Sequence, residues 1–194
     1  MQIDYPVGAT PLDPNEMQGL IPVHLVTKAE LDRWEQENIN DALAWIEKKK
    51  PADILNESFI RTLHKQMFCN TWKWTGTFRT SDKNIGVSWH QIPIQLKQLC
   101  DNATYWMEQN TFGNNEIAVR FHHKLVYIHI FPNGNGRHAR FMADIMMEYV
   151  FHEDPFTWGK ANLIKSGTDR KRYIDSLKAA DQGDYSLLMD FAHS

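Results

Sequence analysis

The chain has 194 residues, of which 42% are hydrophobic and 23% charged, proportions that are typical of a folded globular domain. The formal net charge of −3 gives no general basic surface, which argues against direct nucleic-acid binding and requires any anion site to be local. The two cysteines are too few for a disulfide framework or a thiolate zinc site. No apolar run approaches the roughly 20 residues that cross a bilayer. The first residues also lack the basic start and apolar core of a signal peptide, so we expect a cytoplasmic protein that does not enter the membrane.

Residues 1–26 are rich in proline and small residues, which predicts an extended N-terminal arm, and residues 27–194 are predicted to form a single helical domain. Thr27 and Glu30 form a capping box that begins a predicted helix over residues 27–49. Asn56 is expected to cap a second helix, and Pro93 fits the first turn of a third.

Residues 72–93 interrupt this helical pattern. Gly76, Asp82, Asn84 and Gly86 are turn residues flanked by strand formers, so we expect a small β-hairpin at about residues 76–92.

The remainder of the chain returns to helical spacing. One helix is predicted from Asn115 to near Pro132 and another from about Gly136 to Val150, while Thr168 and Asp184 are expected to cap two shorter helices. The predicted fold class is therefore mainly α with one small hairpin.

The segment with the clearest chemistry is HIFPNGNGRHAR, residues 129–140. Gly134 and Gly136 permit positive φ angles and close backbone approach, so that successive N–H groups can converge on an anion at the start of the next helix. Arg137 and Arg140 are three residues apart and share a helical face, from which they can grip phosphate oxygens. His129 precedes this cradle, and an ordinary pKa of about 6.5 would let it accept a proton from a hydroxyl.

This segment resembles the signature of the Fic family of nucleotidyl transferases, commonly written HPFx(D/E)GNGRxxR. The matching positions are His129, Phe131, Gly134, Asn135, Gly136, Arg137 and Arg140. In addition, Ile85, Gly86 and Val87 resemble the family's substrate-aligning flap, and residues 63–79 resemble the region that precedes it. The N-terminal arm and the C-terminal residues are similar to the Fic subgroup called mobile mystery protein B.

The resemblance implies a Fic-type helical bundle that transfers AMP from ATP to a Ser, Thr or Tyr hydroxyl of a target protein. It also implies that His129 deprotonates the hydroxyl and that the loop from Asn133 to Gly136, with Asn135, holds the phosphates. By the same resemblance Arg137 contacts the β-phosphate region and Arg140 the γ-phosphate. Ile85, Gly86 and Val87 would pair with the target backbone as an added strand, whereas Phe131 is expected to be a core anchor.

Two positions depart from the family pattern. Ile130 replaces a proline, and Asn133 replaces the acidic residue that coordinates Mg²⁺ in the family. An amide oxygen is a weaker ligand for a hard dication than a carboxylate. Either the nucleotide phosphates hold most of the Mg²⁺ or Mn²⁺, or the donor, reaction or metal differs. The alternatives are a nucleotide-binding module with weak or different phosphotransfer activity, and an interaction protein that binds no nucleotide.

Many Fic proteins carry an inhibitory helix with the pattern (S/T)xxxE(G/N), whose glutamate pairs with the second arginine of the signature. The nearest match is residues 14–19, where Glu16, Gln18 and Gly19 form a possible inhibitory segment. Other possibilities are inhibition by a separate chain and an arm that only covers apolar surface. The subgroup's name further suggests a small DNA-binding partner protein.

His122 and His123 lie close to His129 in the sequence but lack a metal-ligand spacing. We expect them to be surface residues or residues that support the site from behind it.

Overall fold

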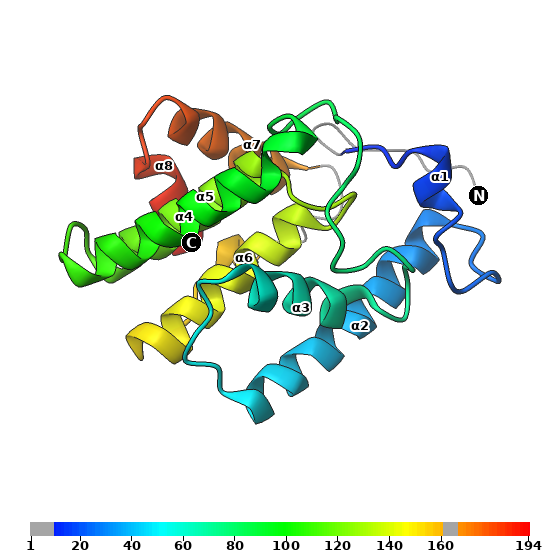
Figure 1. The fold of residues 1–194 in the computed structure, drawn as a ribbon, viewed down its shortest axis with the longest axis horizontal. Helices are drawn as coiled ribbons and strands as arrows, with labels where there is room; N and C mark the ends of the chain where they lie inside the picture. The colour runs from blue at the N-terminus through cyan, green and yellow to red at the C-terminus, as the bar shows by residue number, and fades with distance from the viewer. Residues whose placement is uncertain (1–9, 161–166) are drawn as a thin grey trace.

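The computed structural model describes residues 10–160 and 167–194, and helices make up its regular structure (Figure 1). This confirms the predicted fold class. No helix within these two ranges is long and apolar enough to span a bilayer. The α-helices are α1 (Pro14–Met17), α2 (Lys28–Lys49), α3 (Glu57–Phe68), α4 (Ile92–Glu108), α5 (Asn114–Ile128), α6 (Asn135–Ile145), α7 (Thr168–Asp181) and α8 (Ser186–Ala192).

Side-chain caps explain where the first long helices begin. The Glu30 N–H donates to Thr27 Oγ1 at 3.2 Å, and the Thr27 N–H donates back to the Glu30 carboxylate at 2.9 Å, which is the predicted capping box. The Phe59 N–H donates to Asn56 Oδ1 at 2.8 Å, and Pro93 lies in the first turn of α4. These three helices are therefore confirmed, and the side-chain caps at Thr27 and Asn56 are worth about 1 kcal/mol each.

The later helices differ from prediction mainly at their ends. α5 begins at Asn114 because Gly113 is its N-cap, and α7 begins at Thr168 itself after Gly167. After Ile145 the helix continues as a π-helical turn, Met146–Phe151, so the predicted stretch to Val150 is helical but not uniformly α. Asp184 accepts the Ser186 N–H at 3.0 Å, one position before the residue that caps α8.

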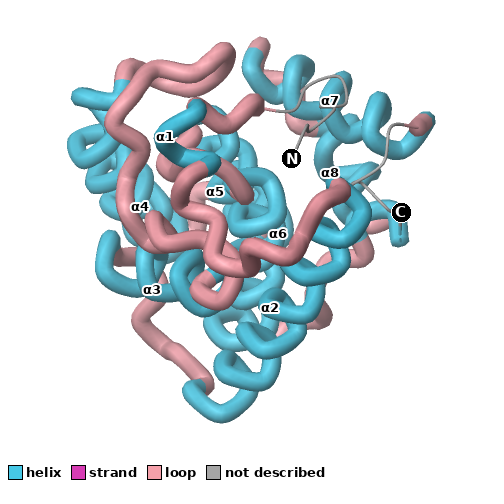
Figure 2. The backbone as a smooth tube through the Cα atoms, turned by 90° about the vertical axis from the view of Figure 1, so that its right-hand side faces the viewer, coloured by secondary structure: helices cyan, strands magenta, loops and turns pink. Residues whose placement is uncertain are grey.

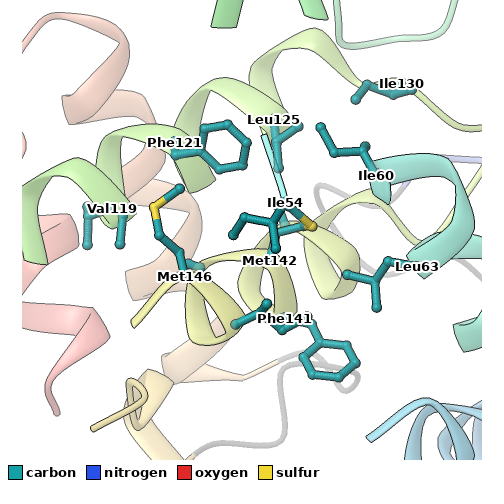
Figure 3. Close-up of a cluster of buried hydrophobic side chains, with 14 of the residues drawn as sticks. Ile54, Ile60, Leu63, Val119, Phe121, Leu125, Ile130, Phe141, Met142 and Met146 are labelled. Atoms are coloured by element: carbon teal, nitrogen blue, oxygen red, sulfur yellow. The ribbon is translucent and has the colours of Figure 1, made fainter. Parts of the chain in front are cut away.

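The core lies between α5 and α6, with α3 closing one side (Figure 3). Phe121 and Leu125 of α5 face Met142 of α6, and Ile60 and Leu63 approach from α3. Each of these side chains is at most 2% exposed, so each contributes about 1.5–3 kcal/mol of hydrophobic stabilisation. α2 packs on α3, α4 on α5 and α7 on α8, which places α2 and α3 on one side of the central pair and α7 and α8 on the other (Figure 1). The connection from α5 to α6 therefore joins two helices whose facing side chains form the core.

The predicted hairpin is wrong. Residues 76–91 form bends, turns and a short 3₁₀ helix, Trp89–Gln91, without a strand, and Ile92 begins α4, as the tube in Figure 2 also shows. The guanidinium of Arg79 donates to the carbonyls of Ser81 and Val87 and thereby bridges the two sides of the segment. These side-chain hydrogen bonds replace the backbone ladder that a hairpin would need. We use the name flap for residues 76–92.

Part of the predicted arm packs against the domain. Asp13 and Glu16 cap α1 reciprocally, with the Asp13 N–H donating to the Glu16 carboxylate at 2.7 Å. Thr10 and Leu25 are each 8% exposed. Residues 10–26 are therefore not extended throughout, since they contain α1 and bury side chains at both ends of this range.

Candidate active site

His129 lies at the junction between α5 and the loop before α6. It ends α5 in the left-handed conformation, with φ of 56°, and its N–H donates to the Leu125 carbonyl at 3.2 Å. The residue is 5% exposed. Burial away from water, followed by the positive charge of Arg79, lowers its pKa from 6.5 to about 4, while the Val126 carbonyl opposes the shift. The imidazole is therefore neutral at pH 7 and able to accept a proton.

The loop after His129 is fixed by Asn135 and by the backbone conformation of Gly134. The Phe131 N–H donates to Asn135 Oδ1 at 2.9 Å, and Asn135 Nδ2 donates to the Phe131 carbonyl at 2.7 Å. Gly134 has a φ of 79°, and a Cβ there would lie 2.7 Å from a ring carbon of Phe68. The loop thus requires the amide side chain of Asn135 and a residue without a side chain at position 134. Phe131 is fully buried, which confirms the expected core anchor.

His64 of α3 clamps the same loop from below. Its Nδ1 accepts the Gly76 N–H at 3.0 Å, so the neutral ring carries its proton on Nε2 and donates to the Asn133 carbonyl, also at 3.0 Å. Burial holds the pKa of His64 well below its usual value, which keeps this tautomer neutral. The ring also stacks on Phe131 with centroids 3.8 Å apart. His64 therefore connects the start of the flap to the loop.

The first turn of α6 offers a place for an anion. Among the described residues, none accepts a hydrogen bond from the backbone N–H groups of Asn135, Gly136 and Arg137. A Cβ built on Gly136 would have as its nearest neighbours Tyr173 Oη at 3.7 Å and Arg140 Nη1 at 3.8 Å. The free amides at the positive end of this helix thus lie close to a guanidinium and a phenol hydroxyl, a combination that suits a phosphate.

The two signature arginines contact different neighbours. Arg137 Nη1 donates to the buried carboxylate of Glu35 on α2 at 2.7 Å, and its guanidinium lies over the Phe68 ring. Arg140 instead lies over the Tyr173 ring of α7, with 5.2 Å to the centroid. No carboxylate in the described part of the chain is within ion-pairing distance of Arg140. Arg140 is therefore available to an anionic ligand, whereas Arg137 is already paired.

Asn133 does not form a metal site with its neighbours. Its Oδ1 accepts the Gly134 N–H at 2.6 Å and lies 3.5 Å from Arg137 Nη2, so the oxygen faces donors. The residues that the structure describes contain no cluster of His, Cys, Asp or Glu able to hold a metal ion. The side chains beside Asn133 therefore do not fit a protein-held Mg²⁺.

The flap is joined to His129 through Arg79 and Gly86. Arg79 is 1% exposed, and its Nε donates to the His129 carbonyl at 2.6 Å. A Cβ on Gly86, whose φ is 100°, would lie 2.6 Å from the Cβ of His129. Ile85 is 43% exposed beside it, while Val87 packs partly against the core. The structure therefore brings the flap residues and His129 together, as expected, through a buried arginine that the pattern did not single out.

The possible inhibitory segment does not contact either signature arginine. Lys83 of the flap, whose side chain is 3% exposed, pairs with Asp13 and with Glu16 at 2.7 Å each. Gln18 is exposed at the end of α1, and Gly19 packs against the Trp74 ring. The carboxylate that does reach Arg137 is Glu35.

His122 and His123 are fully buried, so the expectation of surface residues is wrong. His122 Nε2 lies 2.9 Å from Tyr173 Oη, and His123 contacts Asp181 and Tyr185 of the C-terminal segment. His122 thus contacts Tyr173, the residue whose ring Arg140 covers. Partners that are distant in sequence account for their burial.

Four side chains at the site were not identified from the sequence: Thr10, Glu35, His64 and Arg79. Thr10 Oγ1 lies 3.1 Å from His129 Nε2. Arg79 was the one with a visible signal, because it ends the stretch, residues 63–79, that resembles the region preceding the family's flap. The other three depend on long-range contacts.

Comparison with known proteins finds similarity to one family over the residues of this site. The sequence model of the Fic/DOC family matches residues 54–147, which include His64, Arg79, the flap and the segment 129–140. The protein adenylyltransferase Fic of Aedes aegypti is 29% identical over 119 residues, which is 60% of this chain and 22% of that protein. The chain thus spans about a fifth of the length of this relative.

Solved structures match over most of the chain. The N-terminal FIC domain of Bep8 from Bartonella sp. 1-1C superposes with a TM-score of 0.69 at 14% identity, covering 89% of each chain. The BepC protein of Bartonella tribocorum with bound AMPPNP gives a TM-score of 0.68 at 16% identity, covering 93% of this chain and 97% of that one. At these identities the matches establish the helical fold.

Proposed function

We propose that the chain, whose residues 54–147 match the Fic/DOC family, transfers AMP from ATP to a hydroxyl side chain of a protein, with release of pyrophosphate. The name of its relative, a protein adenylyltransferase, supports this reaction type. The observation that carries the proposal is a neutral, buried imidazole next to a helix start with free amides.

Each part of the site has a role in this reaction. His129 accepts the proton of the incoming Ser, Thr or Tyr hydroxyl, whose oxygen attacks the α-phosphorus. The amides of Asn135, Gly136 and Arg137 hold phosphate oxygens as charge develops, and the bond to the β-phosphate breaks. Arg140 contacts the γ-phosphate from the Tyr173 side.

The other residues keep this geometry in place. Asn135 and His64 fix the loop, and Arg79 holds the flap over His129. The exposed edge at Ile85, Gly86 and Val87 pairs with the backbone of the target, which orients its hydroxyl. Arg137 binds the β-phosphate region once Glu35 has released it.

A second candidate function is a nucleotide-binding module with weak or different phosphotransfer activity. The side-chain oxygen of Asn133 faces N–H donors rather than a metal position, and an amide is a weaker Mg²⁺ ligand than a carboxylate. Both features favour this alternative. In either case ATP enters with Mg²⁺ or Mn²⁺ held mainly by its own phosphates. A separate inhibitory or DNA-binding partner, and membership of the mobile mystery protein B subgroup, are further parts of the proposal.

The test is transfer of α-labelled ATP to proteins of a cell lysate by the purified chain, His129→Ala, and His24→Ala as a control at an exposed histidine. We expect label on a lysate protein with the wild type and the control, and none with His129→Ala. ATP binding without transfer supports the module. If ATP also fails to raise the melting temperature, the chain binds no nucleotide and both functions are contradicted.

A further inference from the structure

The hydroxyl of Thr10 occupies the position that an acceptor hydroxyl would take. Its Oγ1 lies 3.1 Å from Nε2 of His129, and the two residues are 8% and 5% exposed. With the imidazole proton on Nδ1, Nε2 accepts the hydrogen bond from the threonine. This is the geometry needed for proton transfer from a hydroxyl to a base.

Ionic contacts hold the segment that carries Thr10 against the flap. Asp13 accepts from Ser81 Oγ and from Lys83 Nζ, each at 2.7 Å, and Glu16 accepts from the same lysine at 2.7 Å. Because the Lys83 side chain is almost completely buried, these pairs are screened less than surface ion pairs. α1 lies beside loop segments of the chain (Figure 2).

The next residues continue along the domain. Trp74 Nε1 donates to the Glu16 carbonyl at 2.9 Å, and the Lys73 N–H donates to the Gly19 carbonyl at 2.8 Å. Thr10 is therefore placed at His129 by a run of contacts that extends to Gly19, and all of them are within one chain.

From these contacts we propose that Thr10 is itself an AMP acceptor, so that the chain modifies its own N-terminal segment in an intramolecular reaction. The inference rests on the proposed function. The Thr10 hydroxyl oxygen bonds to the α-phosphorus of ATP, its proton goes to His129 Nε2, and the bond from the α-phosphorus to the bridging oxygen breaks as pyrophosphate leaves. Until the arm moves away, this hydroxyl also excludes an outside protein hydroxyl from the base.

The experiment incubates the full chain alone with α-labelled ATP and Mg²⁺ or Mn²⁺, and maps the label by peptide mass spectrometry. We expect one AMP group on the peptide that contains Thr10. The labelled fraction should rise at a rate independent of chain concentration, because base and acceptor belong to one molecule. Label on other residues only, or a rate proportional to chain concentration, overturns the proposal.

Three variants serve as controls. Thr10→Val keeps the shape of the side chain but removes the hydroxyl, and should abolish self-labelling. Thr10→Ser restores a hydroxyl and should recover it, and Thr80→Ala, which removes an exposed hydroxyl of the flap, should label as the wild type does. Retained labelling of Thr10→Val contradicts the assignment.

Labelling of lysate proteins distinguishes a failure of this inference from a failure of the proposed function. We expect Thr10→Val to label them at least as strongly as the wild type, since no hydroxyl of the same chain then competes for the base. A wild-type chain that labels lysate proteins but never Thr10 overturns the inference and leaves the proposed function standing. A chain that labels neither itself nor any lysate protein overturns both.

Discussion

Substitution of Gly86 by alanine tests how closely the flap depends on His129. The new Cβ would lie 2.6 Å from the Cβ of His129, 2.9 Å from Nη2 of Arg79 and 3.2 Å from the carbonyl oxygen of Ile128. Two of these are backbone-fixed atoms, and the third belongs to a buried guanidinium. The methyl group therefore cannot be accommodated by rotating one flexible side chain, and the flap or His129 must shift.

The magnitude follows from two separate effects. Gly86 has a φ of 100°, and a residue with a side chain pays about 1–2 kcal/mol for left-handed backbone. Overpacking against His129 and Arg79 adds about 1–3 kcal/mol. We expect Gly86→Ala to lower the free energy of unfolding by about 2–5 kcal/mol. A displacement of His129 by about 1 Å should lower the rate of AMP transfer roughly 100-fold.

Gly183 supplies the matched control. It has a φ of 91°, but a Cβ there meets nothing within 4 Å, so Gly183→Ala carries only the backbone effect of about 1–2 kcal/mol. Urea unfolding and kcat/KM for transfer should be measured for both variants. Equal destabilisation of the two, together with wild-type transfer by Gly86→Ala, would refute the argument that Gly86 is needed for its contact with His129.

Three further predictions concern charge. His138 of α6 is 1% exposed, and its Nε2 lies 2.9 Å from the Ile60 carbonyl oxygen. Burial lowers the pKa of His129 and of His138 from 6.5 to about 4, so between these values the unfolded chain binds more protons and stability decreases as the pH is lowered. From pH 7 to pH 5 the free energy of unfolding, measured with urea, should decrease by about 2 kcal/mol for each histidine. His138→Gln should remove the part due to His138, and an unchanged decrease in this variant would contradict the lowered pKa of His138. Glu35→Gln should free Arg137 and lower the Kd for ATP about tenfold, whereas Glu57→Gln at an exposed pair should not; equal values for the two variants contradict the pairing. Asn133→Asp should increase Mg²⁺-dependent ATP binding in calorimetry, and no dependence on Mg²⁺ would show that this position does not govern metal use.

The parts of the fold that were predicted correctly depend on local signals. The caps at Thr27 and Asn56 and the proline in the first turn of α4 act within one helical turn, so the sequence alone identifies them. Glycine and aspartate in the flap are also turn signals, but they are common to hairpins and irregular loops. What decided between these was the Arg79 side chain, which bonds carbonyls on both sides of the flap and reaches the end of α5.

The candidate site shows the same division between local and distant contacts. His129, Gly134, Asn135 and the free amides at the start of α6 belong to one continuous segment, which the motif described well. The pairing of Arg137 with Glu35 joins residues on α6 and α2, and neither residue's spacing indicates the other. Thr10 is still more remote from His129, because only the packing of α1 brings them together.

In the proposed reaction the chain moves an adenylyl group to a hydroxyl, with His129 as the base. Parallel reactions with ATP labelled at the α-phosphate or at the γ-phosphate test it most directly, because only the α-label stays on the protein when pyrophosphate leaves. We expect α-label without γ-label on the acceptor, and no label with His129→Ala. Transfer of the γ-label, or α-label that persists in His129→Ala, would contradict it.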